Sequence, residues 1–596
     1  MVPTLAVIFC AMSSVSVYKQ PPLPNSARKP RISLNLASCN MAVSRFAIPG
    51  GSVAIIIPGT GLPPSAIRTV RQRCDLISEM AAVKSNSHLL GNSAWNASAF
   101  LVSVGLNLVI LPFVLFRLGG AVFGVAGLVT ACIAPALAFS NVLALSTTRE
   151  LALRLAPGER DDARRFFATA LLLAGTGGLL IATILSLAGP PLARHVFNLN
   201  GEVANDLTFA FMFGAVGWLC QCISVVFLAL FTARQDYARL ASISVATAVV
   251  STSSMLVLIP LWPQASTFVG CQALGFATAL LASFVISRQV VGEWVARPAL
   301  HRGPLRGLIN LGVWQFAAQS GGLIAGQADR YLLGAFLAPQ FVGYYTIAQR
   351  LEEAMYIGIL KIGETLFPFF SSLQKESSDR IADLLFRASW VLNLLAATLL
   401  GALIPVAGPL LHAWTGKEVA IETQGLLVVL AVAGMLGCAS NVFGYYLLAN
   451  GRSRSNALIA LVTAVVTLAT SALALPYFGW QAAGWSACLG MIAQIVVTMA
   501  LLQQSFSLVG MWPRVAHFVL LPLATGIVTG IALRYVAAER LFDQAPHWWF
   551  IGLSYGLAAC IIVAVVVVVS SIGPYGRTCR RDLRLIAGRF LPGWAV

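Results

Sequence analysis

Four charged side chains lie on one face of an apolar segment near the middle of the chain. Arg350, Glu353, Lys361 and Glu364 fall between residues 341 and 370, and at about 100° per residue they occupy an arc of roughly 80° on a helix. A charge at the centre of a bilayer costs at least about 2.5 kcal/mol, so such groups face a cavity or a partner. Two interpretations stay open: a stripe that faces a substrate path, or two i,i+3 ion pairs with a structural role.

A second polar cluster precedes this segment. Asp329 and Arg330 stand at the end of another apolar stretch, which also carries Gln315, Gln319 and Ser320. An Asp-Arg pair at this position can anchor a helix end at the membrane interface, or it can take part directly in binding a substrate. The residue types alone leave both roles open.

The elements that hold these residues must be membrane helices. Hydrophobic residues make up 58% of the 596 residues and charged residues only 10%, against about 25% charged in soluble domains. Apolar stretches of about 20 residues cross a hydrocarbon core of about 30 Å. Fourteen are predicted, near 93–116, 121–145, 166–188, 206–231, 237–260, 266–288, 307–337, 341–370, 384–411, 423–449, 455–476, 479–503, 514–537 and 547–571.

The chain contains an internal repeat with an offset of about 216 to 219 residues. FRLGG at 116–120 followed by VFGVA at 122–126 is echoed by YLLGA at 331–335 and FVGYY at 341–345. Arg234-Gln235 and the apolar run ending at Pro260 are echoed by 450–452 and the run ending at Pro476. Two related bundles in one chain indicate a transporter, because a site between similar halves can open to either side in turn.

The basic residues predict the orientation. Alternate loops and the C-terminal tail carry most of the arginines, so the positive-inside rule places both termini in the cytoplasm. These loops and the tail then account for the net charge of +17. A nucleic-acid-binding surface is excluded, because the basic residues would have to lie together on a soluble domain and the sequence contains none. Residues 1–87 contain no spanning segment and no ordered secretory-signal pattern. We expect this tail to be disordered, or to precede the true translation start.

Several enzymatic functions are not expected, because the sequence lacks the residues that they require. No G-x-x-x-x-G-K-[ST] phosphate-binding loop occurs in the sequence, so ATP hydrolysis by the chain itself is not expected. The eleven cysteines form no cluster with metal-ligand spacing, and we expect neither a metal nor a cofactor. A membrane glycan polymerase or glycosyltransferase would need a sizeable outside loop with catalytic residues, which we do not find. The chain is therefore predicted not to be an enzyme.

Several motifs resemble the polysaccharide-transporter (O-antigen and exopolysaccharide flippase) family of the multidrug/oligosaccharidyl-lipid/polysaccharide (MOP) exporter superfamily. The second half contains ADRYLLG at 328–334, VGYYTIA at 342–348 and LFPFF at 366–370. The first half has RLG at 117–119 and FGV at 123–125, and GWQAAG at 479–484 opens predicted span twelve. The resemblance covers about 88–505. The related peptidoglycan-precursor flippases carry arginines early in their first helix, whereas residues 93–115 contain none, which argues against that substrate.

The resemblance implies an all-α membrane protein whose two six-helix bundles alternate between inward and outward states around a cationic cavity. We expect the bundles at 88–290 and 291–506, two extra helices at 507–572 and a basic cytoplasmic tail at 573–596. Family members move undecaprenyl-diphosphate-linked oligosaccharides between the leaflets of the bacterial inner membrane, for exopolysaccharide, capsule or O-antigen (lipopolysaccharide) synthesis. Here the diphosphate would meet Arg350, Lys361 and Arg330, with Glu353, Glu364 and Asp329 as their partners. The implied partners are this substrate, membrane lipids and other polysaccharide-assembly proteins.

Two alternatives to this function remain. A small-molecule exporter of the multidrug type would share the fold, and its cavity would favour acidic and aromatic groups over an Arg/Lys stripe. A glycan polymerase or glycosyltransferase is the alternative from another class of protein.

Overall fold

A computed structural model describes most of the chain beyond residue 40. The described residues are 41–48, 51–58, 64–154, 160–197, 199, 201–291, 298–301, 316, 319, 326–363, 366, 370, 378–450, 452–505, 511–541 and 547–590. Eleven helices in these ranges are long and apolar enough to cross a membrane, and the first of them, Ser98–Ala152, contains predicted spans one and two. The predicted all-α membrane class is confirmed.

One small hairpin precedes the helices in the chain. Strand β1 (Met41–Ile48) pairs antiparallel with β2 (Gly51–Pro58), and Ile48 lies opposite Gly51. The β-branched residues of β2 favour a strand. The tail expected to be disordered at 1–87 thus contains this hairpin and the beginning of a helix, while residues 1–40 lie outside the described residues. The domain boundaries stay a prediction.

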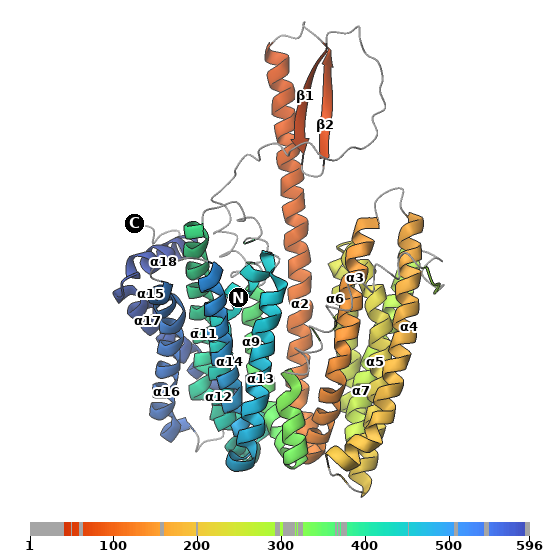
Figure 1. Ribbon diagram of the computed structural model, residues 1–596, viewed down its shortest axis with the longest axis vertical. Helices are drawn as coiled ribbons and strands as arrows, with labels where there is room; N and C mark the ends of the chain where they lie inside the picture. Colours follow the sequence, from red (N-terminus) through yellow and green to blue (C-terminus); the bar gives the residue numbers. More distant parts are fainter. Residues whose placement is uncertain are drawn as a thin grey trace.

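Helix α2 (Pro64–Ile133) joins predicted spans one and two with no loop between them. The helical dihedrals are broken only at Gly119, where φ is 74° and ψ is 164°. A side chain with a Cβ rarely adopts such a positive φ, so glycine permits the break. In Figure 1, α2 runs through the centre of the molecule, between the helices of the two halves.

The remaining elements follow the predicted order of spans. The first half continues with η1 (Ala134–Ala136), α3 (Leu137–Arg154), α4 (Arg160–Pro191), η2 (Leu192–Val196), α5 (Gly201–Ala233), α6 (Tyr237–Leu258) and α7 (Ala265–Val291). The second half has helical residues 326–336, then α9 (Pro339–Gly363), α11 (Ser378–Thr415), α12 (Lys417–Ala449), α13 (Ser453–Phe478) and α14 (Ala482–Ser505). The C-terminal part has α15 (Met511–Val515), η4 (Ala516–Leu520), α16 (Leu521–Leu541), α17 (Trp548–Ile572) and α18 (Gly576–Phe590).

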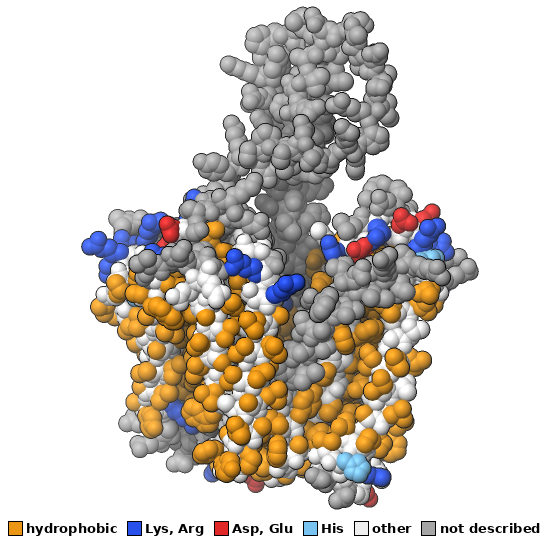
Figure 2. Space-filling view, viewed as in Figure 1, with side chains coloured by type: hydrophobic (Ala, Val, Ile, Leu, Met, Phe, Trp, Pro, Cys, Tyr) orange, Lys and Arg blue, Asp and Glu red, His pale blue; other side chains and the backbone are white. Residues whose placement is uncertain are grey.

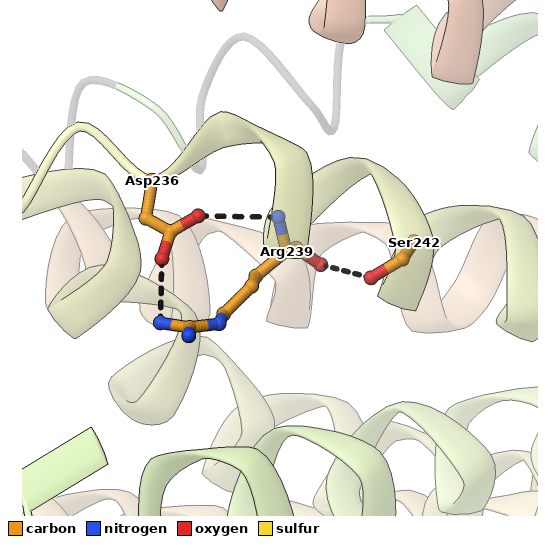
Figure 3. Close-up of polar contacts among 3 residues, drawn as sticks. All are labelled: Asp236, Arg239 and Ser242. Atoms are coloured by element: carbon orange, nitrogen blue, oxygen red, sulfur yellow. Dashed lines mark hydrogen bonds and ion pairs between the residues drawn. The ribbon is translucent and has the colours of Figure 1, made fainter.

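Local chemistry fixes where α6 begins. Gln235 has a positive φ of 58°, which ends the preceding helix, and Asp236 is the N-cap residue. Its carboxylate accepts hydrogen bonds from the backbone N–H of Arg239 at 3.4 Å and from the guanidinium of Arg239 at 2.7 Å (Figure 3). An acidic N-cap satisfies an otherwise unpaired N–H and suits the positive end of the helix dipole.

The two halves touch where α2 crosses the start of α9. A Cβ added to Gly124 would lie 1.8 Å from the carbonyl oxygen of Pro339, and one added to Gly343 would lie 2.5 Å from that of Gly120. Small residues at such positions let two membrane helices approach backbone to backbone. These residues lie at the junctions of predicted spans one and two and of predicted spans seven and eight, which the charge pattern predicts to face the periplasm. We call this place the glycine contact.

Charge is distributed unevenly along the molecule. Figure 2 shows a broad hydrophobic band, with most of the visible Lys and Arg side chains above it, at the end where α18, α3 and α4 meet solvent. Such a band is what lipid solvates, and the basic end is the one that the positive-inside rule assigns to the cytoplasm. The multi-pass membrane location is supported, whereas the cytoplasmic position of the termini stays a prediction.

Candidate functional site

Helix α9 turns the predicted charged stripe toward the first half. Thr346 belongs to the same face as the stripe, and its hydroxyl oxygen would lie 3.3 Å from a Cβ added to Gly127 of α2. Arg350, one helical turn further along, is exposed, and so is Lys361. The face of α9 that packs on α2 at Thr346 is therefore open from Arg350 onward.

Arg350 and Glu353 form one of the two expected ion pairs. Their closest N···O distance is 3.4 Å, and the two side chains are 50% and 40% exposed. Such an accessible pair contributes little to stability, so structural pairing alone is a weak reason for placing two charges here. The cation remains accessible to an anionic ligand.

Arg330 joins the same region from the helix that precedes α9. Its side chain is 5% exposed and donates hydrogen bonds to Gln327 at 2.5 Å and to Gln349 at 2.8 Å. The Nε of Arg330 has no hydrogen-bond partner among the described residues. Arg330 interacts electrostatically with both Arg350 and Glu353, so these three residues form one charged cluster. An arginine donor that is buried and unpaired could still bind an oxygen of a ligand.

Asp329 faces in a different direction from Arg330. Its carboxylate accepts hydrogen bonds from the hydroxyls of Tyr345 at 2.8 Å and Ser471 at 3.1 Å, and the residue is 8% exposed. These bonds link the helix at 326–336 to α9 and α13. Within the described residues no ion pair joins Asp329 to Arg330.

Of the other two predicted residues, Lys361 does not join this cluster. Lys361 is exposed near the end of α9, eleven residues from Arg350, which is about 16 Å along a helix axis. Glu364 lies outside the described residues. The structure thus brings together Arg330, Arg350 and Glu353, and leaves Asp329 beside them in a separate network.

The sequence prediction missed a second acidic residue on α9, next to Glu353 in the chain. The carboxylate of Glu352 points at α12, where its Oε1 would lie 2.3 Å from a Cβ added to Gly434. One turn further, Tyr356 lies 3.5 Å from the side-chain oxygen of Asn441, also on α12. Glu352 falls outside the arc used to define the stripe. The signal that could have found it is the pair Gly434 and Gly437, which marks a close helix contact opposite α9.

A polar pocket continues from this contact into the second half. It has a volume of about 160 Å³ and is lined mainly by α12, α13 and α14. Asn441 belongs both to this pocket and to the contact with Tyr356, and Gln494 donates a hydrogen bond to Ser440 across the helices. The described residues hold no group of three or more metal-ligating side chains. The pocket offers amide and hydroxyl groups instead.

Comparison with known proteins finds a family that resembles part of this chain. Residues 89–374 match the family described as "Polysaccharide biosynthesis protein", and no curated protein matches the chain.

Three similar solved structures are transporters. The lipid II flippase MurJ in an inward closed conformation has a TM-score of 0.61 at 11% identity, covering 80% of this chain and 97% of that one. An inward-facing MATE-family multidrug resistance transporter of the MOP superfamily has a TM-score of 0.58 at 14% identity, covering 68% and 94%. A MOP superfamily transporter from Pyrococcus furiosus has a TM-score of 0.51 at 14% identity, covering 69% and 95%. At these identities the likeness concerns the fold.

Proposed function

Because residues 89–374 match the polysaccharide biosynthesis protein family and the fold resembles that of MOP superfamily transporters, we propose that this chain is a flippase for a lipid-linked oligosaccharide. The substrate is an oligosaccharide on undecaprenyl diphosphate, and it moves from the cytoplasmic to the periplasmic leaflet of a bacterial inner membrane. The product serves the synthesis of exopolysaccharide, capsule or O-antigen. The chain acts as a transporter and catalyses no glycosyl transfer.

The observation that carries this proposal is the exposed cationic face of α9. Arg350 is accessible on the helix face that packs on the first half at Thr346, and Arg330 has an unpaired Nε beside it. Diphosphate oxygens are strong acceptors for guanidinium groups, which can bind them through two parallel hydrogen bonds. Lys361 provides a further cation toward the basic end of the molecule.

The same arrangement explains why two halves are needed. A glycan that crossed hydrocarbon unaided would leave many hydroxyls without hydrogen bonds, each at a cost of several kcal/mol. A polar path between the halves removes that cost, provided that it opens to one leaflet at a time. In this proposal the glycine contact is the closed end of the path, and the exposed charges of α9 lie beyond it.

The proposal is tested by exchanging charges within the Arg350–Glu353 pair. The full-length protein is reconstituted in proteoliposomes with an undecaprenyl-diphosphate-linked oligosaccharide, and the glycan that reaches the opposite leaflet is measured with an impermeant lectin. The double variant Arg350→Glu with Glu353→Arg keeps the ion pair but moves the cation by about 4.5 Å along the axis. We expect transport to fall at least tenfold while protein levels stay normal.

A matched control is available at the start of α4. Arg165 and Asp162 are also an i,i+3 pair, 3.9 Å apart and well exposed, and exchanging their charges is expected to leave transport unchanged. Arg350→Lys should retain more transport than Arg350→Gln. Full transport by the Arg350/Glu353 exchange variant would show that the cation does not meet the substrate. Transport of a lipophilic cation with no movement of the glycan lipid would favour the multidrug-type exporter instead.

A further inference from the structure

The C-terminal helix α18 carries a row of arginines on one face. Arg577, Arg580, Arg581 and Arg584 follow the i, i+3, i+4, i+7 spacing of a helix face, and all four are exposed. Together they line a shallow recess of about 390 Å³. We call these four residues the arginine row. The sequence predicted a basic tail here, but not a helix that orders its charges.

The opposite face of α18 is fastened to the protein. Asp582 is 2% exposed and binds the guanidinium of Arg387 on α11, with its Oδ2 2.8 Å from Nε. Cys579 is fully buried with its sulfur 3.7 Å from Nε2 of His517. The ring of Tyr575, just before the helix, lies 5.3 Å from that of Phe518. These contacts set the direction in which the arginine row points before any ligand arrives.

The positive charge of the row is not neutralised by the protein. Asp582 is the one acidic residue in 573–596, and it is turned inward to Arg387. The structure pairs none of the four arginines with a carboxylate among the described residues. Arg580 donates only to the backbone oxygen of Ser571, at 3.3 Å. Four guanidinium groups therefore face outward with their bidentate donor edges available.

The position of the helix selects the kind of ligand. Helix α18 begins four residues after the apolar helix α17 ends, so its arginines lie at the depth of lipid headgroups, at the basic end of the molecule (Figures 1 and 2). The row extends over seven residues, or about 10 Å along the helix. A row of this length parallel to the bilayer matches the phosphates of neighbouring lipids better than a single diphosphate.

We propose that the arginine row binds the phosphate groups of anionic phospholipids in the adjacent leaflet. Bound lipid then holds α18, and through the Asp582–Arg387 contact it also acts on α11 of the second half. The activity of the second half would in this way respond to the anionic lipid content of its leaflet. This proposal does not depend on which substrate the protein transports.

The experiment measures lipid binding by the full-length protein in detergent. Phosphatidylglycerol is added in steps, and the lipid-bound fraction is read by native mass spectrometry, with phosphatidylcholine in a parallel series. A basic residue near an anionic surface contributes about fivefold in affinity. The variant Arg580→Gln with Arg581→Gln should therefore need about 25-fold more phosphatidylglycerol than the wild type for half saturation. The variant Arg580→Lys with Arg581→Lys keeps both charges, so its increase over the wild type should be much smaller.

The control removes two exposed arginines at the start of α4, also at the basic end. Asp161 and Asp162 already offset these two arginines, with Asp162 3.9 Å from Arg165. Arg164→Gln with Arg165→Gln should therefore change half saturation by less than twofold, and an unchanged elution volume shows that each variant is folded. Equal binding of phosphatidylcholine and phosphatidylglycerol by the wild type would overturn the proposal. So would wild-type affinity in the Arg580/Arg581 glutamine variant. Binding of undecaprenyl diphosphate, or of inorganic diphosphate, in preference to phosphatidylglycerol would also refute it, by assigning the row to the substrate or to any small anion.

Discussion

Replacement of Gly124 by alanine should push the two halves apart at the glycine contact. The added Cβ would lie 1.8 Å from the carbonyl oxygen of Pro339 and 2.6 Å from its carbonyl carbon. Cβ atoms essentially never approach another heavy atom closer than 3.0 Å, so α2 and the start of α9 must separate by about 1.2 Å. The obstacle is backbone, and no side-chain rotation can relieve the clash.

The energetic consequence follows from the cost of overpacking, which is about 1–3 kcal/mol. This cost applies to the state in which the glycine contact is closed, and it disappears when the halves have separated there. A coupling of that size changes the ratio of two conformations by about 5- to 150-fold. We therefore expect Gly124→Ala to favour the conformation that is open at this end, at the expense of the closed one.

Spin labels on either side of the contact measure this change. Cysteines placed at Arg117 and Gln340, both exposed, give the distance distribution between the halves by electron double resonance. In Gly124→Ala the distribution should gain a longer component. Gly105→Ala, on the same helix, is the control, because a Cβ there meets nothing within 4 Å. Identical distributions in wild type, Gly105→Ala and Gly124→Ala would refute the reasoning.

Two further expectations concern α18 and the topology. Burial raises the pKa of the Cys579 thiol to about 11, so it should react slowly at neutral pH. Asp582→Asn weakens the contact with Arg387, and if α18 then detaches the thiol pKa falls toward its ordinary value near 9.0. The thiolate is the reactive species, so labelling of Cys579 at pH 7 should accelerate by up to about 100-fold. The measurement uses a background without the other cysteines. An unchanged labelling rate would show that α18 stays attached. In intact cells, an impermeant reagent should label Lys417→Cys but not Leu300→Cys, and the reverse result would invert the predicted topology.

The spans could be predicted from the sequence because length and hydropathy decide whether a segment crosses a bilayer. Thirteen of the fourteen predicted spans correspond to described helices for most of their length, and the seventh is described only at 316, 319 and 326–337. The joining of spans one and two could not be predicted, since Gly119 reads equally well as part of a loop. The helical form of 576–590 was also missed, because its apolar face is short and most of its other residues are arginines.

The site was predicted only in part, because its partners are distant in the chain. The periodicity of α9 sufficed to place Arg350 beside Glu353 on one face. It could not show that Asp329 binds Ser471, which is 142 residues away, or that Glu352 is accommodated by a missing side chain at Gly434. Such pairs are set by how helices pack, and a single sequence gives no direct information about that packing.

The break at Gly119 has a consequence for how motion passes through the protein. One residue joins two membrane helices, so the chain has no slack between them, and Gly120 and Gly124 follow at once on the second helix. The first helix is also held to α11, since the indole N–H of Trp414 donates to the backbone oxygen of Leu108 at 2.9 Å. A shift of α11 is therefore transmitted to the glycine contact through covalent geometry as well as through packing. Inserting residues at Gly119 would remove the covalent route and leave the packing contacts as the remaining route.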